Sequence, residues 1–108
     1  KFAIISKDEA AHERSLPYQA ATAAAYGLPR EEALKAITIS PAEIFGVADR
    51  VGSLEVGKDA TIIITTGDPL EILCSVDMEF IQGRKVDLTN KQTALYGKYK
   101  EKYRRLKK

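Results

Sequence analysis

The opening segment limits what this chain can fold into more than any other feature. Residues 2–6 are apolar or β-forming at consecutive positions, the pattern of a strand buried on both faces, as in a parallel sheet or barrel. We therefore predict a strand there. The segments that follow are helical in pattern, so this strand has no nearby partner. Its edges and faces need covering, either by a removed part of a longer polypeptide, which we favour, or by a second copy of the chain.

Three helices are predicted next. Pro17 suits the first turn of an alanine-rich helix over residues 17–26, and Gly27 stands where a left-handed cap would end it. Pro29 opens a second helix with acidic residues in its first turn, which favours the helix dipole. Its predicted buried side is formed by Ala33, Leu34 and Ile37. A third, short helix begins with Ser40 as its N-cap and ends at Gly46.

From residue 47 onward the pattern changes from helical to β. Residues 60–66 are rich in Ile and Thr, which favour strands. Residues 76–81 alternate apolar and polar side chains, and residues 82–84 then turn the chain into a second strand over 85–88. We predict a strand followed by a half-exposed hairpin.

The chain ends in a predicted basic helix. Thr89 and Gln92 have the spacing of a capping box, and apolar positions continue at helical spacing to about Arg105. Residues 91–108 hold eight lysines and arginines against the single Glu101, which leaves the rest of the chain acidic overall. The cations go round the helix instead of forming one stripe. We therefore favour a helix whose tyrosines pack on the domain and which binds no nucleic acid.

Composition narrows the class of protein further. No stretch approaches the roughly 20 apolar residues that cross a bilayer, so we expect no membrane partner. Cys74 is the single cysteine, and we interpret it as a small buried apolar residue. With one cysteine and one histidine, the chain alone cannot supply a four-ligand zinc site. The cellular compartment stays open, with the cytoplasm favoured.

A polar stretch directly follows the predicted first strand. In α/β folds functional groups collect at the carboxyl ends of strands, which makes Asp8, His12 and Arg14 the candidates. From the residues alone, Asp8 could simply be a polar loop residue. His12 could be solvated among neighbouring acids, and Arg14 could be a surface ion-pair partner.

Residues 27–46 (GLPREEALKAITISPAEIFG) and 50–60 (RVGSLEVGKDA) carry a family resemblance. They resemble the end of the amidohydrolase superfamily, and most closely its imidazolonepropionase-like members. The first stretch resembles the helix pair after the last barrel strand, and the second resembles the turn G-S-L-x-x-G-K-x-A. Several motifs in the right order are more specific than any one of them.

The resemblance implies an α/β fold: the C-terminal piece of a (β/α)8 barrel, with its last strand and following helices, plus part of a small composite β-sandwich, ending in a helix. Residues 1–48 would be the end of the barrel, with 2–6 as its eighth strand. Residues 49–88 would be part of the sandwich, and 89–108 the terminal helix.

The resemblance also implies a chemistry. Asp8 falls on the family's metal-binding aspartate, which takes a proton from metal-bound water, and the metal would be a divalent ion, zinc being expected. His12 and Arg14 would contact a small-molecule substrate, a cyclic amide or an acylated amino acid. The other ligands would come from the missing N-terminal barrel portion of the polypeptide. We therefore expect the chain alone to bind no metal and to be inactive.

Two other interpretations stay open. The chain could be a non-catalytic module that binds an acidic partner through its basic helix, which a salt-dependent interaction would reveal. It could also be a homo-oligomer, in which the apolar segment 2–6 and the alanine-rich helix bury each other's exposed surfaces. A monomeric mass in light scattering would exclude the second interpretation.

Overall fold

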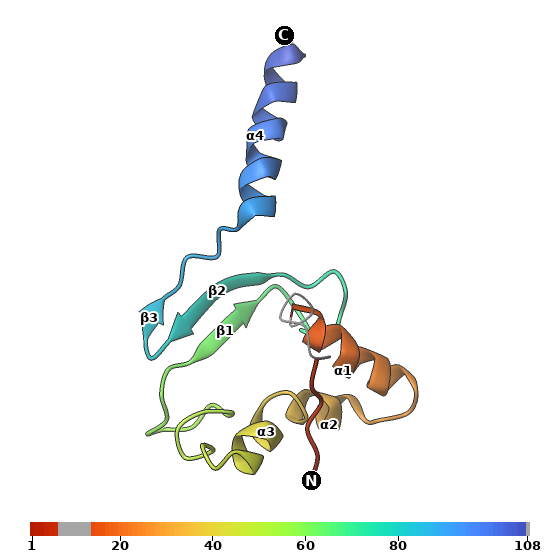
Figure 1. The fold of residues 1–108 in the computed structure, drawn as a ribbon, viewed down its shortest axis with the longest axis vertical. Coiled ribbons are helices and arrows are strands. Elements are labelled where there is room, and N and C mark those ends of the chain that lie inside the picture. The colour runs from red at the N-terminus through yellow and green to blue at the C-terminus, as the bar shows by residue number, and fades with distance from the viewer. Residues whose placement is uncertain (7–13, 108) are drawn as a thin grey trace.

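The computed structural model describes residues 1–6 and 14–107. It contains a helical corner, a small sheet and a separate terminal helix, with overall extents of 57 × 35 × 27 Å (Figure 1). In chain order the elements are α1 (Leu16–Ala25), α2 (Arg30–Lys35), α3 (Ile39–Ile44), β1 (Ile62–Thr65), β2 (Val76–Ile81), β3 (Arg84–Lys85) and α4 (Lys91–Leu106). None of these helices is long and apolar enough to cross a membrane.

The helical corner, residues 14–46, is held together by small side chains. Ala20 of α1 and Ala33 of α2 are completely buried, and Leu70, which follows β1, packs into the same cluster. Alanine brings two helix backbones close together, which is why α1 and α2 pack directly. Gly27 ends α1 with a φ of +116°, so the predicted alanine-rich helix and its glycine stop are confirmed.

The prediction of a strand over residues 2–6 is wrong for this chain. The segment runs up to α2, where the Ile4 N–H donates to the Ala36 carbonyl at 2.9 Å, but within the described residues it pairs with no strand. Phe2 is 49% exposed and Ile5 is 76% exposed. A strand exists only when a neighbouring strand accepts its hydrogen bonds, and this sequence pattern lacks that neighbour here.

Two details of α2 and α3 differ from the prediction. The N-cap of α3 is Thr38, not Ser40, and its side chain makes no cap bond. The Thr38 hydroxyl instead donates back to the Leu34 carbonyl at 2.8 Å. Leu34 itself is exposed, although Ala33 and Ile37 are buried or half-buried as predicted. The acidic first turn of α2 is confirmed.

The sheet is antiparallel, with strand order β1-β2-β3. Ile62 of β1 lies opposite Phe80 of β2, and the register shifts after Ile64. Gln82 and Gly83 form the hairpin turn, both with positive φ (52° and 81°), which matches the right-handed twist of the strands. The predicted strand and hairpin are confirmed, although β3 is shorter than expected. Apolar side chains on both strands remain exposed: Ile63, Ile64, Val76, Met78 and Ile81.

The N-cap of the terminal helix α4 lies one residue later than predicted. The capping box pairs Asn90 with Thr93, whereas Thr89 bonds to the preceding Asp87. The helix extends away from the sheet and the helical corner (Figure 1), and all of its residues except the half-buried Glu101 are exposed. The prediction that its tyrosines pack on the domain is therefore wrong in this structure.

Candidate functional site

Only one of the three residues singled out from the sequence, Arg14, belongs to the described part of the chain. Asp8 and His12 fall outside the described residues. Arg14 is described, and its exposed side chain lies in the short 3₁₀ turn that leads into α1.

The described residues do not fit a metal centre. Within 1–6 and 14–107, no three His, Cys, Asp or Glu side chains are grouped so that they could hold an ion. Cys74 is half-buried, not fully buried as predicted, and its Sγ lies 3.5 Å from the Gly67 carbonyl oxygen. A metal site that used Asp8 would therefore need ligands from outside the described part of the chain.

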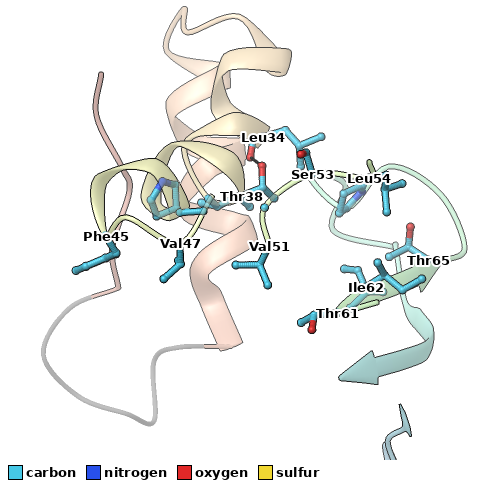
Figure 2. Close-up of a pocket in the computed structure, with 16 residues that line it drawn as sticks. Leu34, Thr38, Phe45, Val47, Val51, Ser53, Leu54, Thr61, Ile62 and Thr65 are labelled. Carbon is cyan, nitrogen blue, oxygen red and sulfur yellow. Dashed lines mark hydrogen bonds between the residues drawn. The ribbon is translucent and has the colours of Figure 1, made fainter. Parts of the chain in front are cut away.

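The described residues form an apolar groove between the helices and the sheet. Its volume is about 650 Å³. Figure 2 shows Thr38 and Phe45 of the α2–α3 region on one wall and Ile62 and Thr65 of β1 on the other. The full lining is Leu34, Ile37, Thr38, Pro41, Ala42, Phe45, Val47, Val51, Gly52, Ser53, Leu54, Thr61, Ile62, Ile63, Thr65 and Pro69.

The side chains that line the groove are not suited to catalysis. Its described lining includes no Asp, Glu, His, Cys, Lys or Arg, so it offers no acid, base or nucleophile beyond the hydroxyl groups of serine and threonine. What it offers is apolar surface. The groove was not predicted from the sequence. The apolar run of β1 and the apolar side of α2 are both visible there, but the sequence does not show that they lie close together.

The motif over residues 50–60 shapes one end of this groove. Gly52 has a φ of +103°, and a Cβ there would lie 2.9 Å from the Ala42 Cβ, so only glycine allows this close approach to α3. Arg50 and Asp59 close the motif: the guanidinium donates to the carboxylate at 2.9 Å, and the Asp59 N–H donates to the Arg50 carbonyl at 2.8 Å. The motif is thus a structural turn.

A second set of bonds ties the tip of the same turn. The Lys58 side chain is only 12% exposed, and its ammonium donates to the Ser53 hydroxyl at 2.6 Å and lies 2.7 Å from the Glu55 carboxylate. The Ser53 hydroxyl donates to the same carboxylate at 2.8 Å. The Lys58 hydrogen bond, followed by that of Ser53, lowers the pKa of Glu55. Each conspicuous polar residue of the motif is used in holding the turn.

An exposed ion-pair cluster joins the helical corner to the chain after β1. The Arg30 guanidinium, at the start of α2, donates to Asp68 at 2.6 Å and to Glu71 at 3.0 Å. The hydrogen bond from Arg30, with a further one from the Leu70 N–H, lowers the pKa of Asp68. This cluster fixes the loop that places Leu70 in the alanine cluster, so its role is positional.

The described structure is mixed α/β, with helices beside a three-stranded antiparallel sheet. The model of the amidohydrolase family matches residues 1–98. The amidohydrolase tasK of Hapsidospora irregularis is 30% identical over 79 residues, which is 73% of this chain and 8% of that protein. The crystal structure of an amidohydrolase from Thermotoga maritima superposes with a TM-score of 0.66 at 41% identity, over 68% of this chain and 19% of the other.

This chain belongs to the amidohydrolase family, a family of hydrolases. It spans only 8% and 19% of the lengths of the two relatives. The family resemblance carried by residues 27–46 and 50–60 is therefore confirmed at the level of the family.

Proposed function

We propose that the complete polypeptide hydrolyses carbon–nitrogen bonds other than ordinary peptide bonds, in small cyclic amides or acylated amino acids, as an imidazolonepropionase-like enzyme. The observation that carries this proposal is the family match over residues 1–98, which includes both sequence motifs. The likeness at 41% identity to an amidohydrolase of known structure supports it.

Asp8 is the residue of this chain that would act on the reacting atoms. A divalent ion, zinc in this proposal, lowers the pKa of a bound water toward neutrality. A carboxylate oxygen of Asp8 would contribute one ligand to that ion and accept the proton that the water loses. His12 would donate a hydrogen bond to the substrate, and the Arg14 guanidinium would bind a substrate carboxylate in a two-point contact.

The rest of the polypeptide would supply what this chain lacks. Three apolar surfaces support this part of the proposal: the segment 2–6, the groove beside β1, and the sheet residues such as Ile64 and Met78. Surfaces of this kind are normally covered. In the full-length polypeptide of this proposal, the N-terminal barrel portion would give residues 2–6 the strand partner that the described residues do not give them, cover all three surfaces and provide the other metal ligands.

The first experiment compares this chain with the full-length polypeptide encoded around it. We expect the full-length protein to contain zinc and to hydrolyse a panel of cyclic amides and acylated amino acids, and this chain to do neither. Stoichiometric metal bound by this chain, or turnover by it, would contradict the proposal.

A substitution in the full-length protein tests the role of Asp8. Asp8→Asn keeps the size of the side chain but removes the proton acceptor, so kcat should fall by about 10²-fold or more. Asp77→Asn is the matched control: it makes the same chemical change on the exposed surface of β2 and should leave kcat unchanged. Equal kcat values for Asp8→Asn and the wild-type protein would remove Asp8 from the mechanism.

A further inference from the structure

The terminal helix α4 stands apart from the part of the family fold that the sequence motifs define. It has 16 residues, none of them buried, and a length of about 24 Å. The connecting residues 86–90 lead it away from the sheet (Figure 1). The family match ends at residue 98, in the middle of the helix.

One face of α4 carries a continuous apolar stripe. Leu95, Tyr99, Tyr103 and Leu106 are spaced by four, four and three residues, which places them on the same side of a helix. Their exposed fractions run from 41% at Leu95 to 70% at Leu106. Tyrosine is among the residues enriched at the centres of protein interfaces, because it combines a large apolar ring with a polar end.

Positive charges border this stripe on both sides. The helix holds six lysines and arginines against Glu101, whose carboxylate is already paired with Arg104 at 2.7 Å and Arg105 at 2.9 Å. By helical position, Lys98 and Lys102 lie along one edge of the stripe and Lys100 lies along the other. The Lys100 ammonium is 5.7 Å from the centre of the Tyr96 ring.

We propose that α4 docks through this stripe onto an acidic protein surface, one with an apolar centre and carboxylates around its rim. The rim of the partner surface should be acidic, because the cations on both edges of the stripe attract carboxylates on both sides of it. The centre of the partner surface should be apolar, because it covers the apolar stripe. A nucleic-acid backbone is a poorer partner, because it would leave Leu95 and Leu106 uncovered. Two α4 helices side by side would bring their cations together, which disfavours pairing with a second copy.

The helix α4 is stabilised by its own residues without a partner, so it is preorganised for docking. The Thr93 N–H donates to the Asn90 side chain and the Asn90 N–H donates to the Thr93 hydroxyl, both at 2.9 Å, so the first turn is closed. Arg104 and Arg105 favour the last turn through the helix dipole. Local order of this kind reduces the entropy that binding would otherwise lose. The proposal does not depend on the hydrolytic activity proposed above.

The test uses this chain and a synthetic helical peptide with leucines along its centre and glutamates on both flanks. We expect saturable binding in calorimetry that weakens at least about tenfold when the salt concentration rises from about 0.05 M to about 0.3 M. The double variant Leu95→Ser, Tyr99→Ser should weaken binding by about tenfold or more. Tyr18→Ser, at an exposed tyrosine of α1, is the control and should change nothing.

Four results would overturn the proposal. The first is equal affinity for a peptide with lysine in place of glutamate, and the second is equal affinity for a glutamate peptide with serine in place of leucine. The third is tighter binding to a DNA duplex or to vesicles of anionic lipid than to the acidic peptide. The fourth is a dimeric mass of the chain alone in light scattering that the double variant makes monomeric, since α4 would then pair with a second copy. Circular dichroism of the double variant checks that α4 remains helical.

Discussion

The helical corner and α4 are both helical, but different forces hold them. In the corner, α1 and the six-residue α2 are fixed by burying Ala20 and Ala33 against each other and against Leu70. In α4, no residue is buried, and the helix relies on a capping box and on the pairs that Glu101 makes with two arginines. Short helices survive through tertiary packing, whereas a projecting helix must be stabilised by its own termini and side chains.

The largest change in the free energy of unfolding should come from enlarging a side chain at the buried contact between α1 and α2. Ala20→Leu forces extra methyl groups between α1 and α2, where Ala20 has no exposed surface, and should reduce the free energy of unfolding by about 2–3 kcal/mol. Urea denaturation followed by circular dichroism measures it. Ala25→Leu, at the exposed end of the same helix, is the control and should stay within about 0.5 kcal/mol of the wild-type value. Equal losses for both variants would mean that α1 and α2 do not pack as described.

A smaller effect should come from the turn that rests on α3. Gly52→Ala places a Cβ 2.9 Å from the Ala42 Cβ at a positive φ, and should cost about 1–2 kcal/mol of unfolding free energy. Gly67→Ala is the matched control, because no atom of the described residues lies within 4 Å of its added Cβ and its φ is not positive. If both glycine variants unfold at the same urea concentration, the close approach of this turn to α3 is contradicted.

The next prediction addresses α4 alone. Asn90→Ala removes the acceptor of the capping bond and should destabilise α4 by about 1 kcal/mol, which hydrogen exchange of the α4 amides can measure. Protection in the corner should not change, since no packing connects the two regions through this residue. Gln92→Ala tests the capping box predicted from the sequence, which pairs Thr89 with Gln92. This substitution should leave the stability of α4 almost unchanged. A larger loss of stability than for Asn90→Ala would favour the cap at Thr89.

The smallest change should be the loss, at low pH, of the stability contributed by the ion pair between Arg30 and Asp68. Because Arg30 lowers the pKa of Asp68 in the folded chain, this pair contributes stability above the usual aspartate pKa, and the contribution is lost as pH falls toward the lower folded value. The urea midpoint should therefore fall between about pH 5 and about pH 2. That fall should be shallower in Asp68→Asn than in the control Asp77→Asn. Identical slopes would show that the pair adds nothing measurable.

Local sequence signals predicted much of the fold. The alanine-rich α1 with its stop at Gly27, the acidic start of α2 and the hairpin around Gly83 all follow from interactions within a few residues. The capping error at α4 was a shift of one residue between two adjacent residues that can both cap, Thr89 and Asn90. Choosing between neighbouring caps depends on backbone geometry that composition does not specify.

The candidate site was predictable only in part. The two motifs led to the amidohydrolase family, and the family model matches residues 1–98. The metal role of Asp8 and the substrate contacts of His12 and Arg14 remain predictions, since they depend on groups that distant parts of a longer polypeptide would bring beside them. The groove beside β1 was not predicted, because its two walls come from separate segments of the chain, with Phe45 of one wall and Ile62 of the other 17 positions apart.

By itself, then, the sequence determined the helices, the hairpin and the family, because short-range hydrogen bonding and recurring motifs are local properties of the chain. The tertiary structure decided which apolar surfaces are covered. Residues 2–6 have the pattern of a buried strand yet find no strand partner among residues 1–6 and 14–107, and the tyrosines of α4 have the spacing of a packed face yet lie exposed. The physical reason is the same in both cases: burial requires a second surface, and a segment's own residues do not specify where that surface lies.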